Sequence, residues 1–393
     1  MSNPLSFSLK KIVVLTMNLS YWEQKTWLTN VDYVVVGSGI VGLSTALHLK
    51  IKQPNTKIII LEKGLFPQGA STKNAGFACF GSLSEILKDL ESHSESEVIE
   101  LVSQRHKGLN LLRTTLGDDA LCYQQLGGYE LFLEKDELLF DTCSQKMKEI
   151  NSLLKPIFKG DVFSNISNHF NFHRIQNQYI RNQFEGQIDT GKMMQVLIKR
   201  VQELGVIILN NTKVERYFEH SDKISIQTSR FELSALKLIF TTNGFAKQLI
   251  NEDVQPARAQ VLITKPIDNL HIKGTFHLDF GYYYFRNIDN RILLGGGRNL
   301  DIEGETTTEL AQTKKIQQSL ENLLTHTILP ETNYEIEQRW SGIMGVGSKK
   351  KPIIKQLSEH VYCGVRMGGM GVAIGSLIGK KISNFFNNSS SFS

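Results

Sequence analysis

The chain has 393 residues, of which 41% are hydrophobic and 21% are charged, and its formal net charge is +5. This composition is typical of a folded globular protein and excludes collagen-like, disulfide-rich and disordered chains. The length suits about two domains. No segment approaches the roughly 18 consecutive apolar residues that a membrane span requires, and the small charge excess does not indicate a nucleic-acid partner.

The cysteines and the two ends of the chain indicate a cytoplasmic protein without a metal site. Cys79, Cys122, Cys143 and Cys363 have no paired spacing and no histidine cluster beside them, so we expect reduced thiols. The apolar run after Lys11 is too short for a signal peptide, and Met17 is a candidate start. We expect an N-terminal extension at 1–19 and a polar tail at 386–393. Between them, a first helix should pack Tyr21 and Trp22 against the main body.

The stretch from Val31 to Glu62 has the pattern of a strand, a glycine-rich turn, a helix and a second strand. Gly37, Gly39 and Gly42 stand at GxGxxG spacing directly after an apolar β-branched run. These glycines suit a tight turn, close approach of a pyrophosphate and close packing of helix on sheet. The helix N-terminus favours phosphate, and Glu62 can accept hydrogen bonds from a ribose. The unit therefore predicts a dinucleotide site.

Periodicity predicts the remaining elements in chain order. Residues 63–82, rich in glycine and hydroxyl side chains, should form a loop folded inwards against a ligand. Helices are expected at 84–90, 97–116, 135–154, 192–204 and 313–324, and strands at 127–133, 206–209, 260–264, 275–278, 282–286, 292–295, 336–340 and 361–365. Residues 156–185 should form short strands and loops, 211–215 should continue the strand pattern of 206–209, and 231–239 should contain two strands. Asp289–Asn290 should turn an antiparallel hairpin.

A second strand, glycine-rich turn and helix follow near the C-terminus. The strand at 361–365 enters the turn at Gly368, Gly369 and Gly371, and a helical pattern continues to Ile382. A second anion or ring site at a helix N-terminus is therefore expected.

Together, these features resemble the D-amino-acid-oxidase-like family of FAD-dependent oxidoreductases, which includes glycine, sarcosine and γ-glutamylputrescine oxidases. The resemblance runs from about residue 20 to 385 and includes the opening unit, the segment Gly69–Gly76, the tyrosine-rich hairpin and the closing glycine-rich turn. Pro256–Val261 and Trp340–Gly342 match family segments that lead into and out of the substrate domain.

The resemblance implies an α/β fold in which an FAD-binding Rossmann-like domain is interleaved with an α+β substrate domain on a mixed, largely antiparallel sheet. The FAD-binding domain would comprise 20–96, 186–257 and 340–385, and the substrate domain 97–185 and 258–339. FAD would be bound without a covalent link, although Cys79 is a candidate for attachment. The implied FAD-binding residues are Gly37, Ser38, Gly39, Ile40, Val41, Gly42, Glu62, Lys63, Ser71, Thr72, Asn74, Ala75, Gly76, Val214, Gly244, Gly368, Gly369, Met370, Gly371 and Val372.

Substrate recognition is where the sequence departs from the family. Amino-acid oxidases of the family place an arginine shortly after the Trp-x-Gly match, where it binds the substrate carboxylate, but this chain has Met344. Arg286 and Arg366 are the replacements to consider, and Tyr284 could orient a polar group. Alternatively, Arg286 pairs with Asp289 and Arg366 with a structural carboxylate. An amine without an α-carboxylate is then an alternative substrate.

The resemblance implies oxidation of a C–N bond in a small amine or amino acid by hydride transfer to flavin N5, with oxygen or another electron acceptor. No general base is required if the amine arrives neutral, and the sequence shows no evident catalytic constellation. Two alternatives remain. One is a tRNA-modifying flavoenzyme that acts on a substituted uridine, suggested by Lys349–Lys351, and the other is a non-catalytic flavoprotein subunit.

Overall fold

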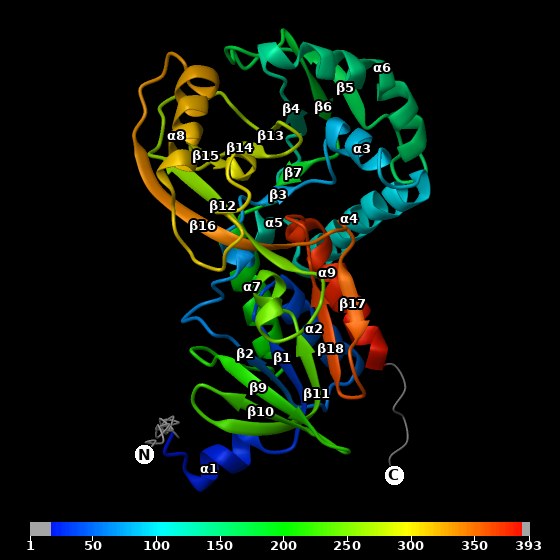
Figure 1. Cartoon of the computed structure of the whole chain (residues 1–393), viewed down its shortest axis with the longest axis vertical. Coiled ribbons are helices and arrows are strands. Elements are labelled where there is room, and N and C mark those ends of the chain that lie inside the picture. The colour runs from blue at the N-terminus through cyan, green and yellow to red at the C-terminus, as the bar shows by residue number, and fades with distance from the viewer. Residues whose placement is uncertain (1–16, 387–393) are drawn as a thin grey trace, which may run out of the picture.

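Two large β-sheets stand one above the other along the long axis of the molecule (Figure 1). The computed structural model describes residues 17–386, so the expectations for residues 1–16 and 387–393 lie outside the described part. Within that part, no helix combines the length and apolar character needed to cross a membrane.

The first sheet is built around parallel strands. Its members are β1 (Val31–Val36), β2 (Ile58–Leu61), β8 (Ile207–Leu209), β9 (Val214–Glu219), β10 (Ile224–Thr228), β11 (Glu232–Phe240), β17 (Ile353–Gln356) and β18 (Val361–Val365). The order is β17-β18-β11-β1-β2-β8, with β10 pairing with β11 and β9 with β10. The pairings β18–β11, β11–β1, β1–β2 and β2–β8 are parallel.

Both faces of this sheet are covered, which explains the continuous apolar pattern of β1. Tyr33 and Val35 pack in the cluster that includes α2 (Ile40–Lys52), α7 (Thr190–Glu203) and α9 (Gly371–Ser383). Val34 and Val36 point to the opposite face, where the antiparallel strands β9 and β10 cover the sheet. β1 is an inner strand of this sheet, and its carboxyl end opens onto the region between the two sheets.

The second sheet is largely antiparallel. Its strands are β4 (Gly128–Glu130), β5 (Phe163–Ser167), β6 (Gln178–Asn182), β12 (Gln255–Thr264), β13 (Thr275–Leu278), β14 (Tyr283–Ile288), β15 (Arg291–Gly296) and β16 (Ile336–Val346). The order is β16-β12-β15-β14-β13-β4-β6-β5, and only the β13–β4 pairing is parallel. Asp289 and Asn290 both have positive φ, at 48° and 56°, as a two-residue type I′ hairpin turn requires.

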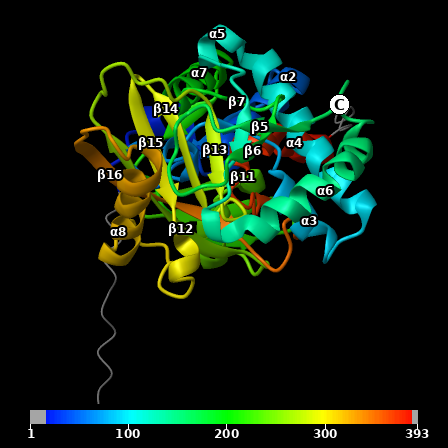
Figure 2. The same ribbon diagram turned by 90° about the horizontal axis from the view of Figure 1, so that it is seen from above.

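The remaining elements surround the two sheets. Helices α3 (Leu83–Leu90), α4 (Glu95–Leu116) and α6 (Glu137–Leu154) lie on one side and α8 (Lys314–Leu323) on the other, as Figure 2 shows from above. The short strands β3 (Phe77–Ala78) and β7 (Gly186–Gln187) pair with each other between the sheets, and α5 (Asp118–Leu121) precedes β4. The parallel first sheet and largely antiparallel second sheet confirm the fold class that the sequence predicts.

Three local predictions are wrong. The two strands expected within 231–239 are one strand, β11, at Glu232–Phe240, and its hairpin partner β10 was not predicted. Residues 211–215 do not continue β8, because the chain turns there and β9 pairs only with β10. The first helix, α1 (Tyr21–Glu23), leaves Tyr21 and Trp22 66% and 68% exposed, so neither packs on the main body.

Candidate functional site

A cavity of about 1330 Å³ lies between the two sheets and is lined by residues of both. It begins at the glycine-rich turn after β1 and reaches the tyrosine-rich hairpin of the second sheet. The structure brings these sequence-predicted residues to its wall: Gly37, Gly39, Ile40, Val41, Glu62, Lys63, Ser71, Asn74, Ala75, Val214, Tyr284, Met344, Gly368, Gly369, Met370, Gly371 and Val372. Segments far apart in the sequence therefore share one concave surface.

The glycine-rich turn is held by contacts that exclude larger residues. Gly37 has a φ of +102°, and a Cβ on Gly42 would lie 2.0 Å from the Gly37 carbonyl oxygen. Helix α2 therefore starts in direct contact with the turn. A Cβ on Gly39 would lie 2.9 Å from Oγ of Ser71, which accepts the backbone N–H of Ile40 at 3.0 Å. The cavity thus meets the first turn of α2 and the Ser71 hydroxyl together.

The carboxylate of Glu62 is buried and hydrogen-bonded at the end of β2. Its Oε2 accepts the hydroxyl of Ser38 at 2.8 Å and the backbone N–H of Ser38 at 3.1 Å. Its Oε1 accepts the N–H of Gly64 at 2.9 Å. Because a carboxylate oxygen can accept two hydrogen bonds, Oε1 keeps one acceptor position for a ligand in the cavity.

Beside Glu62, the Nζ of Lys63 lies 3.2 Å from the centre of the Phe245 ring. Burial lowers the pKa of Lys63, although the neighbouring Glu62 carboxylate opposes this effect.

The loop after Glu62 is folded inwards, as expected, and Asn74 holds its shape. The Asn74 amide donates to the carbonyls of Ala70 and Ser71, and its side-chain oxygen accepts the N–H of Gly76 and the hydroxyl of Thr190. These contacts leave Ala75 at the cavity wall. A loop with this many internal hydrogen bonds presents a fixed surface to a ligand.

The second glycine-rich turn faces the same cavity from the start of α9. Gly368 and Gly369 have φ values of +58° and +81°, which glycine adopts without strain. A Cβ on Gly369 would lie 3.3 Å from the sulfur of Met344, so the turn and this side chain are close neighbours. The N-terminus of α9 brings a partial positive charge to this part of the wall.

Seven predicted site residues do not line the cavity: Ser38, Gly42, Thr72, Gly76, Gly244, Arg286 and Arg366. Ser38 and Gly42 shape the turn from behind, as described above. Thr72 is exposed, and its hydroxyl donates to the Pro67 carbonyl. A Cβ on Gly244 would meet the Met344 carbonyl oxygen at 2.3 Å, so this glycine serves close packing.

The guanidinium groups of Arg286 and Arg366, the two arginines predicted to bind the substrate, are hydrogen-bonded to other groups of the protein. Arg286 donates to the carbonyls of Ala75, Gly76 and Ile188, and no ion pair joins it to Asp289 among the described residues. Burial lowers the pKa of Arg286 to about 10. Arg366 pairs with Asp253 and also donates to the Lys351 carbonyl.

Several cavity residues escaped the sequence analysis, and Arg298 is the most informative. It follows the glycine run that ends β15, and its side chain makes no hydrogen bond or ion pair within residues 17–386. Its Nε is buried without a partner. The signal that could have identified it is its position two residues after the end of β15, where Gly296 also lines the cavity.

The wall near Tyr284 is aromatic and carries titratable groups. The rings of Phe77 and Tyr284 are 5.7 Å apart, and those of Phe77 and His277 are 5.1 Å apart. Burial raises the pKa of Tyr284 to about 12, so its hydroxyl stays protonated at neutral pH. Cys79 also lines this wall. This part of the cavity suits a small ligand with an apolar body and a few polar groups.

Comparison with known proteins gives one family. The model of the FAD dependent oxidoreductase family (DAO) matches residues 32–384. The chain is 22% identical over 378 residues to a probable oxidoreductase, OrdL, of Haemophilus influenzae, and 22% identical over 376 residues to γ-glutamylputrescine oxidoreductase of Escherichia coli. These alignments cover 90% and 89% of this chain and 82% of each relative. Glycine oxidase from Geobacillus kaustophilus superposes with a TM-score of 0.73 at 16% identity, covering 92% of this chain and 96% of that one.

Proposed function

The chain belongs to the D-amino-acid-oxidase-like (DAO) family of FAD-dependent oxidoreductases, and we propose that it oxidises the C–N bond of a small amine or amino acid. The single observation that carries this proposal is the continuous cavity, which joins a dinucleotide-type turn to an aromatic wall and is also lined by Arg298, an arginine unpaired within residues 17–386. Relatives named as a γ-glutamylputrescine oxidoreductase and a glycine oxidase support an amine-bearing substrate.

The cavity fits FAD at the end formed by the first sheet. Glu62 and Val214 would hold the adenosine, while Gly39, Ile40 and Ser71 would meet the pyrophosphate. A Cβ on Gly39 would come within 2.9 Å of the Ser71 oxygen, so the turn has no room for a side chain where a phosphate would approach. Thr242 on the same wall has a buried hydroxyl with no hydrogen-bond partner in the described part of the chain, which a polar ligand would satisfy.

The flavin would lie between the loop at Asn74–Ala75 and the turn at Gly368–Val372. When bound, it supplies the electron sink by accepting a hydride at N5. The chain's own residues then position the substrate and exclude water. The partial positive charge at the N-terminus of α9 would stabilise negative charge at that end of the cavity.

We assign the substrate carboxylate to Arg298. Arg286 and Arg366 are occupied by protein acceptors, whereas Arg298 lines the cavity with its guanidinium unpaired within residues 17–386. A guanidinium can hold a carboxylate through two parallel hydrogen bonds, which favours an amino acid over a simple amine. Tyr284 and Met344 would form the adjoining wall.

FAD is proposed to bind without a covalent link. Burial raises the pKa of the Cys79 thiol well above its usual range, helped by the carboxylates of Glu185 and Glu85, so Cys79 stays a weak nucleophile. After acid precipitation the yellow colour should remain in the supernatant. Colour in the pellet that disappears in Cys79→Ser would reject the proposal.

The domain division expected from the sequence is also proposed here. Strands of the first sheet fall within 20–96, 186–257 and 340–385, while most strands of the second fall within 97–185 and 258–339. Two strands cross these limits, since β12 begins at Gln255 and β16 runs to Val346. The cytoplasmic location and the identity of the electron acceptor remain predictions.

An experiment can distinguish tRNA modification from the oxidation of a small amine or amino acid. Lys349 and Lys350 reach the cavity wall, but Lys350 pairs with Asp89, which favours a structural role. RNA that copurifies and dissociates with salt would support the alternative.

The proposed function is tested by an anaerobic screen of flavin reduction. The protein loaded with FAD is mixed with matched pairs of amines that differ only in an α-carboxylate, including N-methyl and D-amino acids. We expect the oxidised flavin colour to disappear faster with the carboxylate-bearing member of a pair. If no amine reduces the flavin, the non-catalytic subunit becomes the better account.

A further inference from the structure

A buried histidine on β13 faces the substrate end of the cavity. His277 lies between the buried core residues Phe276 and Leu278, so strand alternation turns its side chain to the opposite face of the sheet. There it lines the cavity and is only 7% exposed, with its ring edge-on to Phe77. Its strand partner on β14 is Tyr284, so the two side chains lie next to each other.

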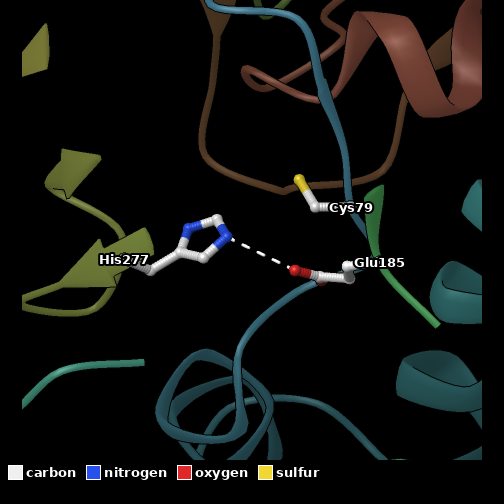
Figure 3. Close-up of side chains that lie close together, drawn as sticks. All are labelled: Cys79, Glu185 and His277. Carbon is white, nitrogen blue, oxygen red and sulfur yellow. Dashed lines mark ion pairs between the residues drawn. The ribbon is translucent and has the colours of Figure 1, made fainter. Parts of the chain in front are cut away.

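The partner of this histidine is Glu185, which directly precedes β7. The Oε2 of Glu185 lies 3.4 Å from Nε2 of His277 and makes an ion pair with it (Figure 3). Its other oxygen, Oε1, accepts the backbone N–H of Phe80 at 3.0 Å, which fixes the carboxylate. Glu185 is 1% exposed, so this is a buried pair.

The two ring nitrogens of His277 have different surroundings. Nε2 is fully buried and lies 3.4 Å from the Glu185 carboxylate, but it has no hydrogen-bond partner within residues 17–386. The second nitrogen, Nδ1, lies on the other side of the ring, away from Glu185 (Figure 3). Since His277 lines the cavity, Nδ1 is the nitrogen that can meet a ligand. A carboxylate at Nε2 favours the tautomer with its proton there, which leaves a lone pair on Nδ1.

The electrostatic surroundings favour a basic imidazole. Burial is the largest single influence and lowers the pKa of His277, but Glu185, Glu85 and Glu130 together raise it, and the net effect is a raised pKa. The titratable groups that face His277 come from five segments: Cys79, Glu85, Glu130, Glu185 and Tyr284. The three acidic residues all raise the pKa of His277, although burial also raises the pKa of Glu130 itself. Tyr284 and Cys79 stay protonated because burial raises their pKa values.

We propose that His277, oriented by Glu185, is a general base that takes the proton from the ammonium group of the substrate. This role rests on the proposed function, because an amine must be neutral before a hydride can leave the neighbouring carbon. One N–H bond of the ammonium breaks and one N–H bond forms at Nδ1, while the electron pair stays on the amine nitrogen. The Glu185 carboxylate orients the ring and stabilises the imidazolium, so Glu185 is a positioning residue.

The test measures flavin reduction against pH in the FAD-loaded protein, using the fastest amine of the anaerobic screen. His277→Gln should slow reduction at neutral pH by about 10²- to 10⁴-fold, the range of general-base catalysis. Its rate should then recover by about tenfold per pH unit up to the pKa of the amine itself, because solvent must supply the neutral form. His220→Gln, which changes an exposed histidine, should keep the wild-type profile.

A second measurement does not depend on turnover. In ¹⁵N-histidine NMR titrations, the pKa of His277 should lie above that of a free histidine and should fall in Glu185→Gln. Glutamine can still accept the Phe80 N–H, so this variant changes the charge while keeping that contact. A His277 pKa that is unaffected by Glu185→Gln would overturn the role of Glu185.

The outcomes separate the two proposals. If an amine reduces the wild-type flavin and His277→Gln reduces it with an unchanged pH profile, the base is rejected while the proposed function stands. If no amine reduces the wild-type flavin, the proposed function fails and the base fails with it. The ligand atoms of Cys79, Glu185 and His277 lie within 4.8 Å of one another. Stoichiometric zinc that is lost in Cys79→Ser would therefore also overturn the base, since these three residues would then form a metal centre.

Discussion

Glu62 accepts two hydrogen bonds from Ser38, one from its hydroxyl at 2.8 Å and one from its backbone N–H at 3.1 Å. Glu62, the acidic residue that follows β2, is therefore held against the glycine-rich turn that precedes α2. A single carboxylate thus joins the two parts of the nucleotide end of the cavity, so its charge should control both local order and cofactor affinity.

We expect Glu62→Gln to weaken FAD binding by about 10- to 100-fold, or about 1.4 to 2.8 kcal/mol. Glutamine presents an N–H group where Ser38 or Gly64 now donates, so at least one buried donor loses its acceptor. The measurement is the Kd of FAD for the apoprotein by fluorescence. Glu232→Gln, at an exposed site on β11, is the control. Equal affinities in the two variants would contradict the role of Glu62.

The close contact between α2 and its turn should make Gly42 intolerant of any side chain. In Gly42→Ala the added Cβ would lie 2.0 Å from the Gly37 carbonyl oxygen, so helix or turn must shift. We expect unfolding stability to fall by about 1 to 3 kcal/mol. Gly69→Ala, whose Cβ would have no atom within 4 Å, should retain the wild-type melting temperature. Comparable losses in both variants would refute the packing argument.

Arg298 and Arg286 should respond differently to replacement by methionine. Arg298→Met should raise the KM for a carboxylate-bearing amine by about 10- to 100-fold, as expected for a lost charge-assisted pair. It should leave the melting temperature unchanged, because Arg298 has no protein partner within residues 17–386. Arg286→Met should instead destabilise the fold, since three backbone carbonyls lose their donor. A KM in Arg298→Met equal to that of the wild type would show that another residue binds the substrate carboxylate.

A buried histidine on α2 should limit stability in acid. Burial lowers the pKa of His48 to about 4, and Lys380 and Lys52 act in the same direction. The unfolded chain therefore binds this proton at higher pH than the folded one. The stabilising contribution is complete above about pH 6.5 and decreases as pH falls toward 4, by about 3 kcal/mol. In urea unfolding, His48→Gln should show a shallower loss of stability over this interval, and an unchanged slope would exclude His48 as the cause.

Local sequence patterns predicted the strands and turns that depend only on residues close together in the sequence. The strand at Thr275–Leu278 and the turn at Asp289–Asn290 were anticipated because alternation and turn residues are encoded within a few positions. The extent of β12 was not, since Pro256 argues against a central strand. The structure tolerates Pro256 because β15 pairs only with Gln260–Ile263, which leaves one side of β12 without a strand partner there.

The polar contacts of the cavity depend on residues distant in sequence. Arg286 is occupied by carbonyls 98 to 211 positions away, and no pattern around Arg286 reveals them. The pairing of His277 with Glu185 likewise depends on how β7 and β13 approach each other. The sequence could predict where the cofactor domain begins. Deciding which of Arg286, Arg298 and Arg366 is free to bind the substrate carboxylate required their three-dimensional positions.

The most direct test of the central claim is an anaerobic titration of the FAD-loaded protein with the fastest amine from the screen. We expect one equivalent of amine to reduce one equivalent of flavin and to yield one equivalent of the carbonyl product that forms when the imine hydrolyses. A substrate deuterated at the carbon bearing nitrogen should be oxidised more slowly. A fully loaded protein whose flavin stays oxidised with every amine, or whose reduction yields no carbonyl product, would contradict the claim.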